Sequence, residues 1–126
     1  MLQNFFALLL LTSLHAVAAT PVDLLAGYIA QAGQPANISK GEAFFKASHG
    51  QEWQCTSCHG KSPMTGGHHA STDKAIEPLA PGANPKRFTD SAKVEKWFRR
   101  NCKDVLAREC TAAEKADVLA WLISVR

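Results

Sequence analysis

Three features that would indicate large classes of protein are missing from this sequence. Lys and Arg exceed Asp and Glu by only 14 to 11, a formal net charge of +3, which gives no basis for predicting nucleic-acid binding. No segment alternates apolar and polar residues, so strands are not expected. No internal repeat is present, which excludes solenoid and propeller architectures.

A long apolar span is missing as well. Residues 5–11 are nearly all apolar, but they fall well short of the roughly 20 residues that cross a bilayer. Small residues follow at 17–19, where a signal peptidase reads them. We therefore expect residues 1–19 to be a cleaved signal peptide, although they contain no Lys or Arg, and residues 20–126 to form a single domain. Export to the periplasm without a membrane anchor follows from that expectation.

The most informative feature that is present is one C-x-x-C-H motif, formed by Cys55, Cys58 and His59. In such a motif the two thiols add to the vinyl groups of a haem, and the histidine lies under the iron as proximal ligand. One motif predicts one covalently bound haem c. Attachment of this kind takes place outside the cytoplasm, which agrees with an exported chain.

The other two of the four cysteines, Cys102 and Cys110, are expected to form a disulfide. Disulfides are the default for spare cysteines in an oxidising compartment. A pair of free redox-active thiols is the alternative, but the spacing is not that of a C-x-x-C redox motif.

Helix-start signals occur four times, and each precedes apolar residues at helical spacing. The capping residues expected from the pattern are Thr20 before Pro21, Ser39 in a capping box, Asp90 or Ser91, and Thr111 in a second capping box. Between the second and third helices, residues 60–89 are rich in Gly and Pro and are expected to form a long loop, with at most one helical turn.

This arrangement predicts an all-α class I cytochrome c fold, in which the helices and the long loop surround one haem. In such a layout the helix before the motif packs on the last helix. We expect Gly41 and Phe45 to meet the face that carries Trp121 and Leu122, and Trp53 to lie along the haem edge.

Methionine, the usual distal ligand of an electron-carrying cytochrome of this layout, is nearly absent. After Met1 the only methionine is Met64, which follows Cys58 too closely to cross easily to the other haem face. We interpret Met64 as a loop residue. Histidine is the next candidate: His49 precedes the motif, and His68 or His69 in the distal position would make a bis-histidine electron carrier.

A family resemblance adds another candidate, Asn101, which from the residues alone is simply the end of a helix. Much of the chain resembles the SHP (sphaeroides haem protein) cytochromes c. The segments that carry the resemblance are EPLAP at 77–81, RFTDSAKVEKWF at 87–98, RNC at 100–102, CT at 110–111 and EKADVLAW at 114–121, with weaker similarity at 25–28 and 41–45.

The resemblance implies a high-spin haem whose ferric iron is ligated by His59 and by the Asn101 side chain, with the Cys102–Cys110 disulfide beside it. It also implies that the reduced protein binds O2, NO or CO, and that a dihaem cytochrome c donates the electrons. An amide oxygen is a hard, weak ligand that suits ferric better than ferrous iron, so we expect reduction to release Asn101. A plain electron carrier with a histidine distal ligand is the alternative. The gas-binding interpretation includes a small terminal oxidase or a nitric oxide handling protein, and an enzyme such as a peroxidase is a third class.

Overall fold

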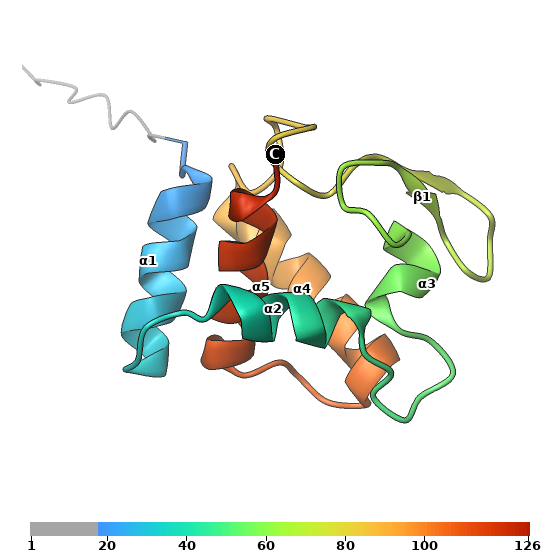
Figure 1. Ribbon diagram of the computed structural model, residues 1–126, viewed down its shortest axis with the longest axis horizontal. Coiled ribbons are helices and arrows are strands. Elements are labelled where there is room, and N and C mark those ends of the chain that lie inside the picture. Colours follow the sequence, from blue (N-terminus) through green and yellow to red (C-terminus); the bar gives the residue numbers. More distant parts are fainter. Residues whose placement is uncertain (1–17) are drawn as a thin grey trace, which may run out of the picture.

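The structure, a computed structural model, describes residues 18–126, so all but the last two residues of the expected signal peptide lie outside it. Figure 1 shows a group of helices with one small hairpin. The elements are α1 (Pro21–Ala32), α2 (Ile38–Lys46), α3 (Cys55–His59), β1 (Gly67–His68), β2 (Ala75–Ile76), α4 (Ser91–Leu106) and α5 (Ala112–Ser124). None of the helices within residues 18–126 is long and apolar enough to cross a membrane.

Helix α5 is the centre of the fold, because both α1 and α2 pack against it. Its Leu119 and Leu122 are almost fully buried. Leu119 belongs to the same cluster as Tyr28 of α1, and Leu122 belongs to the cluster around Phe45 of α2. Burying an apolar side chain of this size stabilises a fold by about 1.5–3 kcal/mol, so α5 holds both neighbouring helices.

The expected contact between α2 and α5 is confirmed. The rings of Phe45 and Trp121 lie 4.9 Å apart, and Gly41 is buried at the crossing of the two helices. A Cβ placed on Gly41 would lie 1.9 Å from the Asp117 backbone oxygen. Glycine at this position therefore sets how closely the two helices approach.

Helix α2 begins earlier than the sequence suggested, so the prediction that Ser39 caps it is wrong. The capping residue is Asn37, whose side chain accepts a hydrogen bond from the Lys40 backbone N–H at 2.9 Å. The Asn37 backbone N–H in turn donates to the Asp117 carboxylate at 2.6 Å. A residue 80 positions away thus fixes the start of α2. The caps at Thr20, Asp90 and Thr111 are found as expected.

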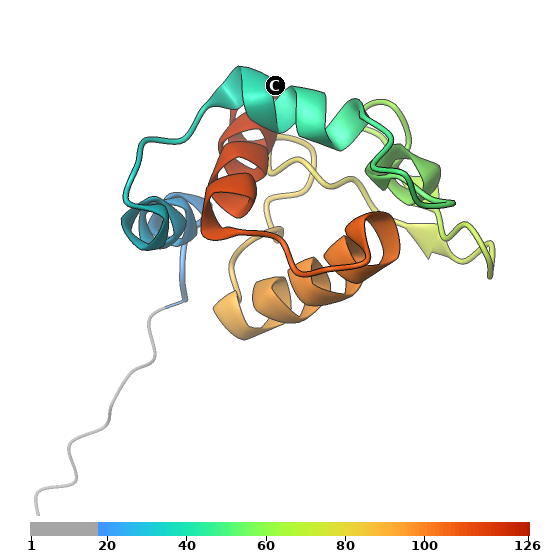
Figure 2. The same cartoon turned by 90° about the horizontal axis from the view of Figure 1, so that it is seen from below.

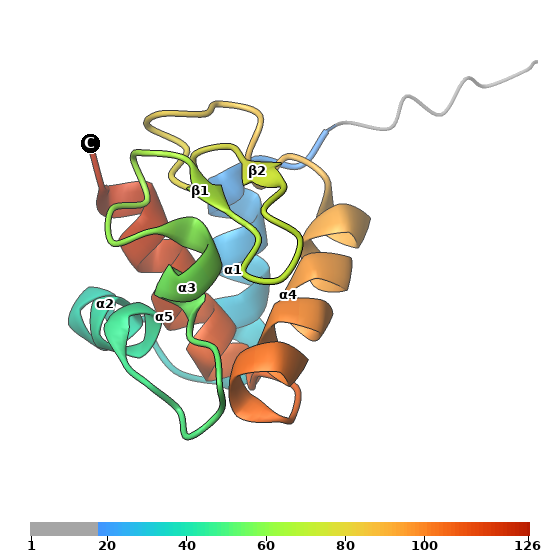
Figure 3. The same cartoon turned by 90° about the vertical axis from the view of Figure 1, so that its right-hand side faces the viewer.

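The loop at 60–89 contains an antiparallel pair of strands, β1 and β2, that the sequence did not predict. Each strand has two residues, which is too short for an alternating pattern. The hairpin lies against α3, because a Cβ on Gly67 would come within 2.0 Å of the Cys58 backbone oxygen. Figures 2 and 3 agree that α4 and α2 lie on opposite sides of α5.

Candidate haem-binding site

The C-x-x-C-H motif forms the short helix α3, so its three residues follow one another around a single turn. At its start, the Ser57 hydroxyl accepts a hydrogen bond from the Gln54 N–H at 3.0 Å. At its end, Gly60 takes a positive φ of 72°. Both Cys55 and Cys58 are free thiols. Burial raises the pKa of Cys55 to about 11, which keeps it protonated.

The His59 imidazole is set into the protein with one nitrogen unsatisfied. Its Nδ1 is buried and has no hydrogen-bond partner among the described residues, and its ring lies 6.2 Å from that of Phe45. Burial, and to a smaller extent the charge of Arg87, lowers the pKa of His59 to about 4. A neutral imidazole is the form that binds iron. Two free thiols one turn apart and a neutral imidazole therefore fit a covalently attached haem.

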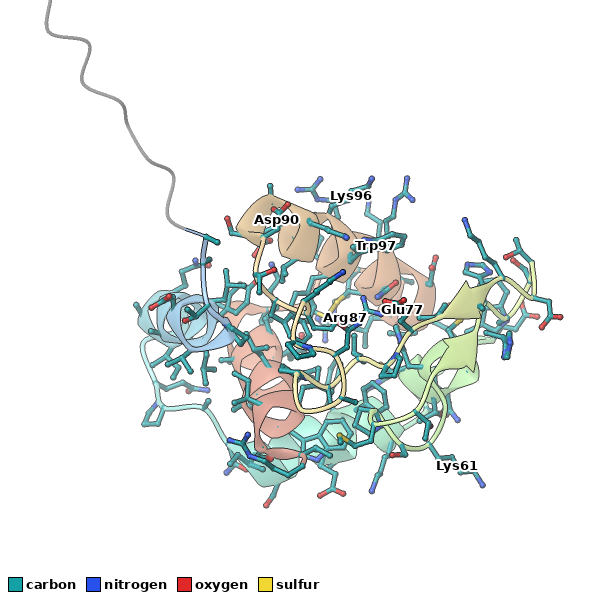
Figure 4. The ribbon with its side chains drawn as sticks, turned by 90° about the horizontal axis from the view of Figure 1, so that it is seen from above. Lys61, Glu77, Arg87, Asp90, Lys96 and Trp97 are labelled. Carbon is teal, nitrogen blue, oxygen red and sulfur yellow. A yellow bond between two sulfur atoms is a disulfide. The ribbon has the colours of Figure 1, made fainter. Side chains whose placement is uncertain are left out.

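Arg87 lies close enough to His59 to affect its charge state, and the loop holds it there. Its Nε donates to the Pro78 carbonyl at 2.9 Å and its Nη2 to the Glu77 carbonyl at 2.7 Å (Figure 4). The next residue, Phe88, has a φ of 59° and contacts both core clusters. Nothing in the sequence pattern singled out Arg87, because its partners are backbone carbonyls.

The hairpin keeps His68 and His69 beside α3. The Cys58 sulfur accepts a hydrogen bond from the Ala70 N–H at 3.3 Å. The Nδ1 atom of His69 accepts from the Ser71 N–H at 3.3 Å, and its ring lies 6.3 Å from that of Trp53. Trp53 therefore meets the hairpin. Met64 is a turn residue, as interpreted from the sequence, and its methyl group lies beside Gly82.

Asn101 lies inside α4, half-buried, immediately before the disulfide. The helix continues to Leu106, so the expectation that Asn101 ends a helix is wrong. Cys102 and Cys110 are bonded as the sequence led us to expect, with their Cα atoms 5.6 Å apart. Cys102 is buried. The bond joins the last turns of α4 to the residue that precedes the cap of α5, so the segment around Asn101 is tied to the central helix.

A second anchor holds α4 on the other side of Asn101, and sequence reasoning missed it. The Glu95 carboxylate accepts hydrogen bonds from the Tyr28 hydroxyl at 2.5 Å and from Lys115 at 2.8 Å. The ring of Phe98 meets that of Tyr28 edge to face at 5.7 Å. Because Tyr28, Glu95 and Lys115 come from three helices, no local pattern could have revealed this cluster.

Known proteins are similar to this chain over most of its length. The family model described as a domain of unknown function (DUF1924) matches residues 31–122. The cytochrome c-type protein SHP of Cereibacter sphaeroides is 50% identical over 107 residues, 82% of either chain. Cytochrome c'' of Methylophilus methylotrophus is 42% identical over 92 residues, 70% of this chain and 64% of the relative.

Two solved structures have the same fold. Oxidized SHP, described as an oxygen-binding cytochrome c, matches with a TM-score of 0.81 and 48% identity, over 86% of this chain and 99% of the chain in that solved structure. Oxidized cytochrome c'' matches with a TM-score of 0.72 and 37% identity, over 84% of this chain and 94% of its own. A solution structure of cytochrome c'' carries a description that refers to haem-ligand detachment.

Proposed function

Because the chain belongs to the DUF1924 family and to the SHP class of c-type cytochromes, with one covalently bound haem c, we propose that it is a high-spin, gas-binding cytochrome of the periplasm. It takes up an electron and then binds a small diatomic ligand, O2, NO or CO. The observation that carries this proposal is the match to the solved structure of an oxygen-binding cytochrome over 99% of its chain.

In this proposal, some residues attach the haem and others ligate its iron. Cys55 and Cys58 hold the haem covalently, and the neutral His59 imidazole binds the iron. The Asn101 amide oxygen would be a second ligand of the ferric iron. When bound, the haem would supply an iron that accepts one electron and can bind a small ligand. With the sixth position held only by a weak ligand, the two thioethers prevent loss of the haem.

Asn101 is the gate in this proposal. A neutral amide oxygen is a hard donor that would hold ferric iron better than the softer ferrous ion, so reduction would release the Asn101 side chain. The disulfide at Cys102 and the contacts of Glu95 and Phe98 support a movement of the side chain alone, because both flanks of the segment are tied down. The released amide N–H would then be free to donate a hydrogen bond to an incoming ligand.

The alternative, a six-coordinate electron carrier with His68 or His69 as the distal ligand, has less support. Both residues lie on the hairpin that packs against α3, and His69 already accepts a hydrogen bond within its own turn. The electron donor in our proposal is a dihaem cytochrome c or a similar small redox protein.

The visible absorption spectrum of the holoprotein, ferric and then ferrous, with and without CO, tests the proposal. We expect a high-spin ferric spectrum and rapid CO binding after reduction. Low-spin spectra in both states, with no response to CO, would contradict it and favour the histidine-ligated carrier. Recovery of the protein in the periplasmic fraction tests the proposed location.

A further inference from the structure

The charge of this protein is concentrated on one helix. Helix α4 contains five basic residues and two acidic ones, a net charge of +3. The whole chain also has a formal net charge of +3, so the other residues together are balanced. A single charged helix on an otherwise neutral chain produces a directional field that steers partners of opposite charge.

Four of the basic residues share one side of α4, since Lys93, Lys96, Arg100 and Lys103 recur every three or four positions. All four are exposed, and we call them the basic face of α4. The other charged residues of the helix are engaged elsewhere or lie at its end. Glu95 turns inward to Tyr28 and Lys115, Arg99 pairs with Glu109 at 3.6 Å, and Asp104 borders the face in the last turn.

An exposed tryptophan interrupts the basic face. Trp97 is 43% exposed, unlike the buried Trp121. The Arg100 guanidinium lies 5.6 Å from its ring centre and the Lys96 ammonium 5.9 Å (Figure 4). Tryptophan and arginine are the residues most often found where binding energy concentrates in a protein interface. Trp97 also precedes Asn101 by one helical turn, which places the patch beside the proposed iron ligand.

We propose that the basic face of α4, with Trp97 within it, docks an acidic face of the protein that donates the electron. The inference rests on the proposed function and names the surface through which its electron arrives. One electron passes from the reduced partner to the ferric protein; the partner is oxidised, and no atom is transferred. Charge complementarity selects the partner, because the net charge of this chain lies on this helix.

A pair of charge reversals with a matched control tests the surface. Lys96→Glu/Arg100→Glu alters the basic face, and Lys40→Glu/Lys61→Glu makes the same change in net charge elsewhere. Lys40 and Lys61 are exposed, and Figure 4 shows Lys61 on the opposite side from Lys96. The probe is reduced flavodoxin, an acidic one-electron donor, mixed with the ferric holoprotein in a stopped-flow instrument.

We expect the first variant to be reduced about tenfold more slowly at low ionic strength and near the wild-type rate at high salt, because steering is screened by salt. The control should change far less. Carbodiimide cross-links to flavodoxin should map to the basic face in the wild type. If both variants are slowed equally, or if the first is not slowed, the basic face of α4 is not the docking surface. Cross-links that map elsewhere would lead to the same conclusion.

A separate measurement distinguishes this proposal from the function on which it rests. Each variant, reduced with dithionite, should bind CO like the wild type, which also shows that it has folded. If CO binds normally but the rate with flavodoxin does not depend on the basic face, only the docking surface fails. If the wild type itself does not bind CO, the proposed gas-binding function fails. The neutral variant Lys96→Gln/Arg100→Gln should give an intermediate rate.

Discussion

The Tyr28 hydroxyl of α1 donates a hydrogen bond of 2.5 Å to the Glu95 carboxylate of α4, across 67 positions of the sequence. Lys115 of α5 reaches the other carboxylate oxygen and lies 5.4 Å from the centre of the Tyr28 ring. Three helices therefore meet at one carboxylate. Since α4 also carries Asn101, this cluster sets where the proposed ligand stands relative to the core.

Replacing Tyr28 with phenylalanine removes only the hydroxyl group and should loosen α4. Hydrogen bonds to charged groups contribute about 1.5–3 kcal/mol, and we expect a loss of that order in the free energy of unfolding, measured with denaturant. The same substitution in a Glu95→Gln background should cost less, because the charged acceptor is already gone. Equal losses in both backgrounds would show that the two side chains do not interact.

The same carboxylate predicts a dependence of stability on pH. Partial burial raises the pKa of Glu95, but hydrogen bonds from Lys115 and Tyr28 outweigh burial, and the net pKa lies below its ordinary value of 4.5. The folded state therefore favours the ionised group. Its stabilisation is present above pH 4.5 and is lost as the pH falls through the lowered pKa. The difference in unfolding free energy between wild type and Glu95→Gln should shrink over that acidic range.

Gly41 and Gly27, both within helices, allow a matched comparison of how a glycine-to-alanine substitution changes stability. Gly41→Ala would place a methyl group 1.9 Å from the Asp117 backbone oxygen, so α2 and α5 would have to separate. We expect a loss of more than about 3 kcal/mol or failure to fold. Gly27 in α1 has nothing within 4 Å of such a methyl group. Gly27→Ala should be neutral or stabilising by about 0.5–1 kcal/mol. Thermal unfolding of both variants provides the comparison.

Substitutions at Asn101 test the gate directly. Asn101→His supplies a strong ligand and should convert the ferric spectrum to low spin and slow CO binding to the ferrous protein. Asn101→Ala should leave a high-spin ferric spectrum and fast CO binding. If neither change alters the spectrum, Asn101 does not ligate the iron.

Loss of the disulfide should cost stability and alter ligand binding. The bond spans eight positions, for which a loop-entropy estimate gives about 2–3 kcal/mol. We expect Cys102→Ser/Cys110→Ser to lower the free energy of unfolding by that amount. In our proposal the rate of CO binding should also change, because the segment around Asn101 is no longer tied to α5. An unchanged rate would show that the disulfide stabilises the fold without positioning Asn101.

The sequence revealed the parts of the fold and site that depend on neighbouring residues. The caps at Thr20 and Thr111 follow from side chains three positions apart, and the haem thiols follow from a five-residue motif. The start of α2 was missed because Asn37 is held by Asp117. The hairpin was missed because its strands are short and its place depends on Gly67 against Cys58. The proposed role of Asn101 came only from family resemblance, since an amide within a helix has many uses.

The partition of the four cysteines has a consequence for how the protein is made. Of the single disulfides that four cysteines can form, only the bond between Cys102 and Cys110 leaves Cys55 and Cys58 both available. One pair must be oxidised while the other stays reduced until the cofactor is attached, in the same compartment. During maturation, the enzyme that forms disulfides therefore competes with the enzyme that attaches the haem to Cys55 and Cys58. Overproduction in a host should yield molecules with the wrong disulfides, unless the host supplies enough of both enzymes and of a thiol reductant.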